Sequence, residues 1–529
     1  MVRTRFAPSP TGFLHVGGLR TALYNYLFAR KNNGFFILRI EDTDRTRYVE
    51  GALENLLKTL KWVGLEYDEG PGRDGKYGPY VQSERTETYR EHANKLLDKG
   101  YAYHCFCTTE RLEEMRKRQS ELKQAPMYDR ACLKLAPEEI EAKLHARIPF
   151  VIRQKIPQGQ RLKFKDLIRD TVQFDTSNID DQILMKSDNF PTYHLANVVD
   201  DHLMAITHVI RGEEWLPSTP KHILLYEAFG WRKPEFAHIP LLLNKDKSKL
   251  SKRQGDVSVE DFIKKGYIKE AVINFIAFLG WHPGKGEEQE IFSLEELVEK
   301  FSLEKVHKGG AVFEIDKLDW FNFQWQRKLH YERLDKIAAN LDSEVKISRN
   351  RKNEPVYEFS GPADEKRFIM ERAGLLLKLC EKYLPEKWLA EKDLLYKALI
   401  TIEEKILNKP SDAPQHLDFY FDMKDFPKEL LLNPKMEVDA ATAEKALTES
   451  LNWLKDFKDY ENQPLIRENL LKLIKKLNFK NGQVLWPLRV ALSGLQFSPG
   501  VFEIIWVLGK DETLKRIKET LKKHFKKDV

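Results

Sequence analysis

The chain has 529 residues, of which 42% are hydrophobic and 32% charged, and this composition excludes both a disordered chain and a bundle of membrane-spanning helices. No apolar run approaches the roughly 20 residues that a membrane span needs. Four cysteines are too few for a disulfide framework, so we expect a reducing, cytoplasmic compartment and no membrane partner. The net charge of +6 neither requires nor excludes a nucleic-acid partner.

At roughly 150 residues per domain the length predicts three to four domains, and the chain opens with alternating strand and helix signals. Residues 2–7 favour a strand, residues 8–12 are typical of a turn, and a helix with an apolar stripe ends near residue 33. Residues 35–40 favour a second strand. This order predicts a βαβ unit, and therefore a parallel sheet with a right-handed crossover.

The signals change further along the chain. Residues 105–190 mix short helix-like and strand-like runs, which indicates an insertion. Apolar and β-prone signals resume at residues 192–211, and a loop rich in proline and lysine follows at residues 240–253. Beyond residue 322 the sequence is mostly amphipathic helix. The pattern predicts an α/β half followed by an all-α half.

The first segment that indicates chemistry is the turn into the N-terminal helix, His15-Val16-Gly17-Gly18. Glycines here allow a flat or phosphorylated ligand to approach the backbone, and a helix N-terminus attracts negative charge. The His15 imidazole can donate a hydrogen bond to a phosphate oxygen as charge develops on it. The glycine spacing fits neither a dinucleotide fingerprint nor a Walker loop. A tight loop with a structural histidine is the alternative.

The second segment is the charged loop at residues 246–255, in which Lys249 and Lys252 alternate with small residues. Mobile lysines on such a loop can close over a polyphosphate and neutralise charge in a transition state. A solvated surface loop is the alternative for this segment considered alone.

Together the two loops resemble the paired signatures of class I aminoacyl-tRNA synthetases. Residues 6–18 are similar to the "HIGH" signature and residues 249–253 to the "KMSKS" signature. Further segments resemble the glutamyl-tRNA synthetase family of bacterial type, and they are spread over the chain: residues 39–45, 193–202, 211–215 and 499–504.

The resemblance implies a Rossmann-like parallel-sheet catalytic domain with an inserted domain, followed by an α-helical half. We expect the following divisions: catalytic domain, first half, 1–104; inserted acceptor-binding domain, 105–190; catalytic domain, second half with the lysine loop, 191–253; stem-contact region, 254–325; helical anticodon-binding region, 326–529. The implied partners are tRNA(Glu), ATP and L-glutamate, and a monomer is the family default.

The implied reaction is that of a ligase and has two steps. The α-carboxylate of glutamate attacks the α-phosphorus of ATP and releases pyrophosphate, and the glutamyl group then passes to the 3′-terminal adenosine of tRNA. Mg²⁺ would arrive with ATP. By resemblance the catalytic residues are His15, Lys249 and Lys252. The implied ATP site comprises His15, Gly17, Gly18, Glu214, Trp215, Leu242, Lys249, Ser251, Lys252 and Arg253.

A dicarboxylic substrate needs a cation that excludes the neutral amide, and an arginine fork does this best. Arg5 and Arg211 match the family's glutamate site, and Glu41 would accept the substrate ammonium. The implied glutamate site comprises Arg5, Ala7, Ser9, Glu41, Tyr193, Asn197 and Arg211. Without the motifs, a surface ion pair would be the alternative for Arg5 or Glu41. A site that reads charge rejects glutamine without an editing domain.

Three of the four cysteines fall close together and, with a nearby tyrosine, resemble a zinc site found in some members of the family. The implied ligands are Cys105, Cys107, Tyr128 and Cys132. His104 is an alternative fourth ligand, and Lys134 stands where zinc-binding relatives have a histidine. Unligated thiols are the alternative to a zinc site. The fourth cysteine, Cys380, lies in an apolar helical segment and is expected in the core.

The presence of the C-terminal helical half helps to distinguish this function from the alternatives. A stand-alone nucleotidyltransferase, or a truncated relative that modifies queuosine, would not need it. A non-catalytic tRNA-binding relative is disfavoured because the residues of the implied chemistry are intact: His15, Lys252, Arg5 and Glu41. Glutaminyl-tRNA synthetase is the nearest rival, and an α-helical rather than β-barrel C-terminal half, together with Arg211, disfavours it.

Overall fold

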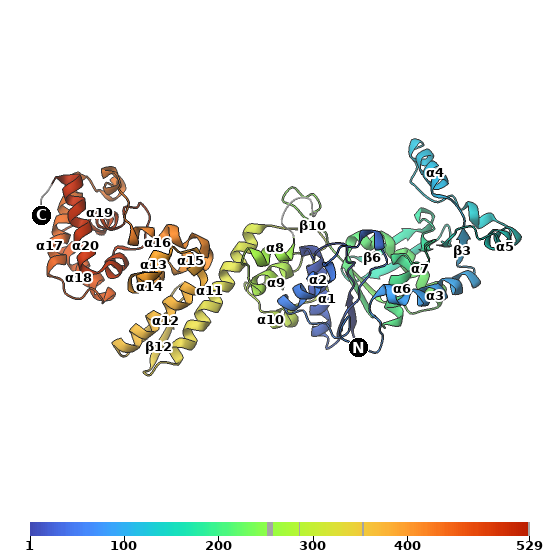
Figure 1. Cartoon of the computed structure of the whole chain (residues 1–529), viewed down its shortest axis with the longest axis horizontal. Coiled ribbons are helices and arrows are strands. Elements are labelled where there is room, and N and C mark those ends of the chain that lie inside the picture. The colour runs from blue at the N-terminus through green and yellow to red at the C-terminus, as the bar shows by residue number, and fades with distance from the viewer. Residues whose placement is uncertain (251–257, 285, 352–353, 527–529) are drawn as a thin grey trace. The chain divides into compact units, whose positions relative to one another are not determined.

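The computed structural model describes residues 1–250, 258–284, 286–351 and 354–526, with the side chain of Arg45 left out. These residues form two compact units, Met1–Asn322 and Phe323–Val529 (Figure 1). Helix α11 (Ile315–Ala339) contains the boundary between them.

The first residues of unit 1 form the predicted βαβ unit. Strand β1 (Arg3–Phe6) leads through a loop into helix α1 (Val16–Lys31), and β2 (Phe35–Leu38) pairs in parallel with β1. The crossover helix lets the two strands run in the same direction. The predicted parallel sheet is therefore confirmed.

A second sheet holds the later strands of unit 1, in the order β6–β5–β9–β8. Its members are β5 (Arg161–Asp166), β6 (Asp170–Asp175), β8 (His208–Gly212) and β9 (Glu235–Ile239). Strand β9 is parallel to both β8 and β5, whereas β5 and β6 are antiparallel. The start of β8 lies beside the start of β1, because the Thr207 amide donates to the Arg3 carbonyl at 3.0 Å. The ends of these strands therefore meet at one edge, where a ligand of such a sheet is expected.

Smaller elements complete unit 1. An antiparallel sheet joins β3 (Ala102–Cys105), β4 (Val151–Gln154) and β7 (Ile183–Met185), and a short parallel pair joins β10 (Leu242–Leu243) to β11 (Ala311–Val312). The other helices of unit 1 are α2 (Ala52–Val63), α3 (Thr86–Asp98), α4 (Thr109–Glu121), α5 (Pro137–His145), α6 (Tyr193–Leu203), α7 (Thr219–Phe229), α8 (Val259–Lys264), α9 (Lys269–Phe278) and α10 (Leu294–Lys300).

One reading of the sequence is corrected in this unit. The β-prone signals at residues 192–211 are confirmed at their end, where residues 208–212 form β8 and include Arg211, but residues 193–203 form helix α6. Val198 and Val199 are fully buried on that helix. Core packing of these side chains outweighs their preference for strands. Strand β5 and β9 also pair across the predicted border at residue 190, and the finer division of unit 1 stays a prediction.

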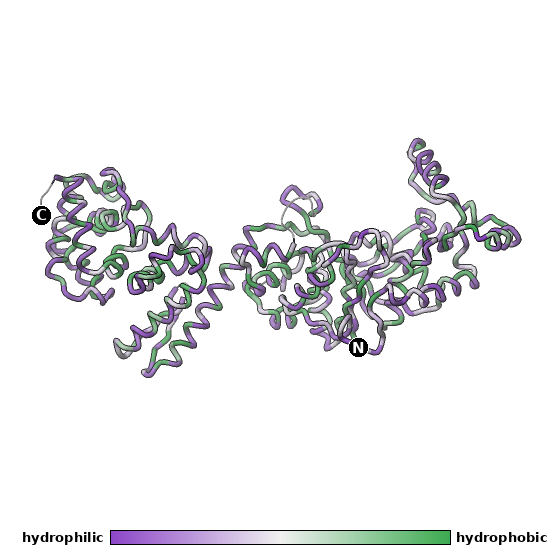
Figure 2. Tube along the Cα trace, viewed as in Figure 1, coloured by the Kyte–Doolittle hydropathy of each residue, from purple (hydrophilic) through white to green (hydrophobic). Residues whose placement is uncertain are grey.

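Unit 2 is helical, as predicted, apart from a hairpin of β12 (Val345–Arg349) and β13 (Pro355–Phe359) that the sequence patterns did not indicate. Green and purple alternate along its helices in Figure 2, the pattern of amphipathic helices around a shared core. Cys380 is fully buried in that core, as expected. The helices after α11 are α12 (Pro362–Cys380), α13 (Glu386–Ala390), α14 (Lys392–Thr401), α15 (Glu403–Asn408), α16 (Ala413–Phe421), α17 (Ala440–Asp456), α18 (Gln463–Lys476), α19 (Asn481–Ser493) and α20 (Val501–Phe525).

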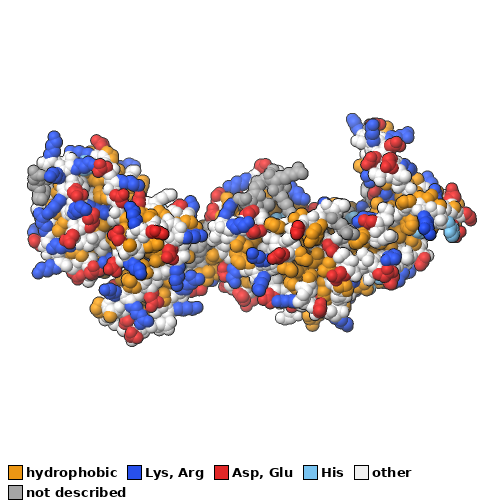
Figure 3. Space-filling view, viewed as in Figure 1, with side chains coloured by type: hydrophobic (Ala, Val, Ile, Leu, Met, Phe, Trp, Pro, Cys, Tyr) orange, Lys and Arg blue, Asp and Glu red, His pale blue; other side chains and the backbone are white. Residues whose placement is uncertain are grey.

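The surface carries charges of both signs. Lys and Arg side chains are interspersed with Asp and Glu over the visible face of each unit (Figure 3). Within the described part of the chain, no helix combines the length and the apolar character needed to cross a lipid bilayer.

Candidate active site

The N-terminus of α1 is capped by His15. Its ring Nδ1 accepts hydrogen bonds from the Gly17 amide at 3.1 Å and the Gly18 amide at 3.3 Å. Because Nδ1 is the acceptor, the ring proton of neutral His15 is on Nε2. A Cβ atom on Gly17 would stand 3.1 Å from His15 Cε1, so glycine at this position leaves room for the imidazole. The result is an N–H donor beside a helix N-terminus, an arrangement suited to an anion.

The lysine loop begins and ends close to this helix. On its near side the Leu250 amide donates to the Leu242 carbonyl at 2.9 Å, and Lys249 forms an antiparallel bridge with Leu243 while remaining exposed. On its far side Ser258 forms an antiparallel bridge with His15. The remaining predicted residues of this loop lie outside the described residues: Ser251, Lys252 and Arg253.

A buried cluster of charges lies where β1, β2 and α6 meet. Arg39 Nη1 lies 2.7 Å from Asp201 Oδ1, and its Nη2 lies 2.9 Å from Glu41 Oε1. Arg5 Nε lies 3.1 Å from the same Asp201 oxygen. The Asn197 carbonyl oxygen accepts one hydrogen bond from each arginine, both at 3.1 Å. Five predicted or motif residues are thus brought into one hydrogen-bonded group.

Burial and ion pairing shift the pKa of the carboxylates in this cluster in opposite directions. Burial raises the pKa of Glu41, and the charges of Arg39 and Arg5 oppose that rise. Burial would also raise the pKa of Asp201, but Arg5 and Arg39 outweigh it and the pKa of Asp201 is lowered. Asp201 therefore stays ionised and holds both arginines.

A further buried carboxylate, Asp200, lies next to this cluster. It accepts hydrogen bonds from Arg85 Nε at 2.7 Å, Gln82 Nε2 at 2.9 Å and the Tyr89 hydroxyl at 2.8 Å. Burial, followed by the charge of Asp200, raises the pKa of Tyr89, so the phenol remains a donor.

Sequence reasoning assigned no role to Arg39, Asp200 or Asp201, although all three lie in segments that carry the resemblance. A signal was present in the spacing. Tyr193, Asn197 and Asp201 follow one another at intervals of four, which places them on one face of α6. That pattern predicts a shared polar face, but it does not say which arginines face it.

Arg211 lies at the end of β8, and only 4% of its surface is exposed. Its Nη1 donates to the Tyr193 hydroxyl at 3.1 Å and lies 3.3 Å from His222 Nδ1. Its Nε donates to His238 Nε2 at 3.1 Å, and its Nη2 donates to Thr219 Oγ1 at 2.9 Å. Thr219, His222 and His238 were not among the predicted site residues.

The other predicted residues lie around the same edge. Ala7 directly follows β1, and Ser9 is exposed in the turn before α1. The ring of Trp215 packs on the ring of Tyr193, with centroids 4.2 Å apart. Glu214 is exposed, next to Trp215. These positions surround the ends of β1 and β8.

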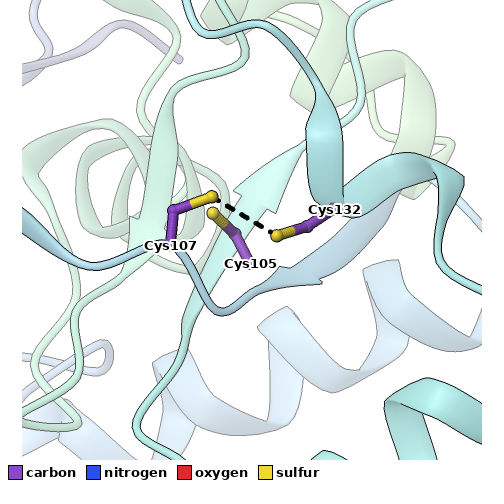
Figure 4. Close-up of side chains that lie close together, drawn as sticks. All are labelled: Cys105, Cys107 and Cys132. Atoms are coloured by element: carbon purple, nitrogen blue, oxygen red, sulfur yellow. Dashed lines mark hydrogen bonds between the residues drawn. The ribbon is translucent and has the colours of Figure 1, made fainter. Parts of the chain in front are cut away.

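The cysteines of the N-terminal unit form a compact cluster (Figure 4). The sulfur atoms of Cys105, Cys107 and Cys132 all lie within 4.8 Å of one another. The Tyr128 hydroxyl lies 3.4 Å from Cys105 Sγ and 3.2 Å from Cys107 Sγ. Four tetrahedral ligands at zinc distances would place their sulfurs about 3.8 Å apart, and the 3.5 Å between Cys107 and Cys132 is close to this value. The donor set therefore fits zinc.

The neighbours of the cluster favour the tyrosine as its fourth member. The His104 ring packs against Phe106 and Phe150, with centroids 6.2 and 4.9 Å away, rather than against the thiols. Lys134 is exposed. The guanidinium of Arg111 donates to Cys107 Sγ at 3.3 Å.

A parallel sheet with a histidine at the first crossover helix and a lysine loop that returns to it defines a class I aminoacyl-tRNA synthetase. Residues 1–320 match the family model described as "tRNA synthetases class I (E and Q), catalytic domain". Residues 375–521 match a model described as "Anticodon binding domain". The curated relatives at about 45% identity over nearly the whole chain are glutamate–tRNA ligases, and the chain belongs to that family.

Individual relatives cover the chain from end to end. The glutamate–tRNA ligase of Chloroherpeton thalassium is 46% identical over 99% of this chain and 98% of its own length. That of Clostridium tetani is 44% identical, with the same coverage of 99% and 98%. A crystal structure of a glutamate tRNA ligase from Elizabethkingia meningosepticum, in complex with its amino acid, is 36% identical with a TM-score of 0.76 and covers 99% of each chain. The resemblance inferred from the motifs is confirmed.

The contacts of Asp200 lead to a prediction about stability. We expect Tyr89→Phe to lower the free energy of unfolding by about 1–3 kcal/mol, because it removes the buried hydroxyl donor and leaves the Asp200 carboxylate with one hydrogen bond fewer. Urea denaturation followed by circular dichroism measures the change. Tyr101→Phe is the control, since Tyr101 is 47% exposed and should change stability little. Equal stability of the two variants would contradict the prediction.

Proposed function

We propose that this member of the glutamate–tRNA ligase family attaches L-glutamate to tRNA(Glu) in two ATP-dependent steps, with unit 1 performing the chemistry. The observation that carries the proposal is one strand edge that holds both a capping histidine at a helix N-terminus and a buried arginine at the end of β8. The first group suits a polyphosphate and the second a carboxylate. The reaction would take place in the cytoplasm, in a monomer.

In the first step the substrate α-carboxylate attacks the α-phosphorus of ATP, and pyrophosphate leaves. The His15 Nε2–H would donate to a phosphate oxygen as negative charge develops there. Gly17 and Gly18 would leave space for the nucleotide, and Lys249 would neutralise charge from its exposed position in the lysine loop. Mg²⁺ bound to ATP supplies further neutralisation. Roles in ATP binding extend by family resemblance to Glu214, Trp215, Leu242, Ser251, Lys252 and Arg253.

The site would recognise the negative charge of the substrate side chain. Arg211 and Arg5 would receive the side-chain carboxylate, with the Tyr193 hydroxyl and Asn197 completing the hydrogen bonds, and Glu41 would accept the ammonium group. Ala7 and Ser9 would line the same edge. Glutamine would be rejected because its neutral amide leaves a buried cation without a counter-charge.

Unit 2 would hold the anticodon. Support comes from the anticodon-binding family model, which covers residues 375–521. A cavity of about 490 Å³ in this unit is lined by side chains that suit a splayed base, among them Trp486, Arg489 and Arg467. The Arg489 guanidinium lies 4.9 Å from the centroid of the Trp486 ring. The region assigned by resemblance to the acceptor end, 105–190, belongs to unit 1, and the region assigned to the stem, 254–325, runs past the end of unit 1 at Asn322.

Pyrophosphate exchange tests the proposed activity. Exchange between ATP and pyrophosphate should require glutamate and should not be supported by glutamine, because only glutamate brings the second carboxylate. The assay is run with each amino acid, with and without tRNA(Glu), and charging of the tRNA is measured in parallel. Exchange that glutamine supports equally well, or activity with neither amino acid, would refute the proposal.

The role of His15 has a test that separates chemistry from folding. We expect His15→Asn to slow glutamate-dependent exchange by roughly 10²-fold, because the developing charge on phosphate loses a donor. Asparagine is a good helix N-cap, so α1 should remain intact. The affinity for glutamate, measured by calorimetry, should change by less than about threefold. A collapse of glutamate affinity with an unchanged rate at saturation would assign His15 to amino-acid binding instead.

The thiol cluster is proposed to bind one zinc ion through Cys105, Cys107, Tyr128 and Cys132. Support comes from the convergence of the three sulfurs and the phenol described above. The ion would have a structural role there, since all four ligand positions are filled by protein. It would hold the end of β3 against the segment that contains Cys132.

Metal analysis tests the zinc proposal. The purified protein should contain one zinc per chain, and Cys132→Ser should lose it together with several degrees of thermal stability. Cys380→Ala is the matched control, because Cys380 lies outside the cluster and should leave the zinc content unchanged. Cobalt substitution should give thiolate-to-metal charge-transfer bands. A metal-free protein whose three clustered thiols all react with a thiol reagent would contradict the proposal.

A further inference from the structure

The surroundings of Arg211 differ from those of the other buried arginines in unit 1. Arg5 and Arg39 are paired with Asp201, and Arg85 is paired with Asp200. Among the residues that the structure describes, no carboxylate lies within ion-pair distance of Arg211. A buried charge normally has an ionic partner. Arg211 instead donates to two imidazoles and two hydroxyls, all of which are neutral acceptors in this arrangement.

His238 owes its acceptor role to Asp166. In the parallel pairing of β8 and β9, Arg211 stands directly opposite His238, and Asp166 at the end of β5 pairs with β9. Asp166 Oδ2 lies 2.6 Å from His238 Nδ1. An ionised carboxylate only accepts, so Nδ1 carries the proton and Nε2 presents its lone pair to Arg211 Nε, 3.1 Å away. Burial lowers the pKa of His238 to about 4, so the ring stays neutral.

His222 acts in the same manner from α7. Its Nδ1 lies 3.3 Å from Arg211 Nη1, and since a guanidinium only donates, Nδ1 is the acceptor. The proton is then on Nε2, which lies 3.0 Å from His194 Nδ1 and donates to it. Burial lowers the pKa of His194 to about 3 and that of His222 well below its usual value. Both rings are therefore neutral. Arg211 donates to His222, and His222 donates to His194.

We infer that His222 and His238 are positioning residues for amino-acid selection: they fix Arg211 with neutral acceptors, so that its charge stays available to the side-chain carboxylate of the substrate. Asp166 sets the tautomer of His238 and reaches Arg211 only through that ring. The inference rests on the proposed role of Arg211 in glutamate binding. An aspartate in place of either histidine would hold the guanidinium equally well, but it would cancel the charge that separates glutamate from glutamine.

A matched pair of substitutions at His222 tests the inference. In the full-length chain, His222→Glu places a carboxylate beside Arg211. It should raise the KM for glutamate roughly ten- to hundredfold and lower the glutamate-to-glutamine ratio of kcat/KM by a similar factor. His222→Gln keeps a neutral acceptor for Arg211 and a donor for His194, and it should restore most of the lost affinity. The KM for ATP should stay within about threefold of the parent value in both variants.

Asp166→Asn tests the tautomer. The asparagine amide would face His238 Nδ1 as a donor and drive the ring proton to Nε2, where it opposes the Arg211 donor. We expect the KM for glutamate to rise roughly tenfold with little change in kcat at saturating glutamate. His92→Gln is the control for loss of a buried histidine on another helix, α3, and should leave the KM for glutamate unchanged. If His222→Glu does not fold, Asp166→Asn decides alone.

Arg211→Met separates this inference from the function on which it rests. A strong loss of glutamate affinity in Arg211→Met, with parent-like selectivity in His222→Glu and Asp166→Asn, would overturn the role of the histidines and leave the proposed function intact. Parent-like glutamate affinity in Arg211→Met would overturn the role of Arg211 itself. Loss of affinity in Arg211→Met together with the selectivity change in His222→Glu supports both.

Discussion

The pairing of one fully buried arginine, Arg39, is the constraint on which the rest of unit 1 depends. Its guanidinium is tied to Asp201, 162 positions away in the sequence, and to Glu41, which follows it just after the end of β2. Loss of one partner of such a pair costs about 3–5 kcal/mol, so β2 and α6 have one favourable register. Arg5 and Asn197 belong to the same hydrogen-bonded group, and the proposed substrate residues are therefore held by contacts that also hold the fold together.

The buried arginines of unit 1 are held either by carboxylates or by neutral acceptors, and the two kinds of partner suit different functions. An aspartate partner stabilises a buried guanidinium but also cancels much of its electrostatic field, as at Arg39. Imidazole and hydroxyl acceptors fix the same geometry and leave the field in place, as at Arg211. The first arrangement suits a residue that organises the fold, and the second suits a residue that must distinguish a charged from a neutral side chain.

Sequence patterns predicted the βαβ unit, the helical second half and the two loops, because each depends on local periodicity or on a short motif. They did not predict the hairpin at residues 345–359, whose two alternating strands are only five residues long and lie within otherwise helical sequence. They also did not predict helix α6, where burial outweighed strand propensity. The acceptors around Arg211 were also missed. His222 and His238 carry no motif of their own, and Asp166 lies 72 positions from His238, so only the sheet register brings them together.

The two oxygens of Asp166 serve different parts of the molecule. Oδ1 accepts from the backbone amides of Ile168 and Arg169, at 3.0 and 2.9 Å, and so holds the turn between β5 and β6. It also accepts from the His238 backbone amide at 3.3 Å, whereas Oδ2 contacts the His238 ring. The free energy of that turn and the electrostatics of the site are therefore thermodynamically coupled. Substitutions in the β5–β6 hairpin and at Arg211 should be non-additive in a double-mutant cycle, even though no residue of that turn belongs to the proposed glutamate site.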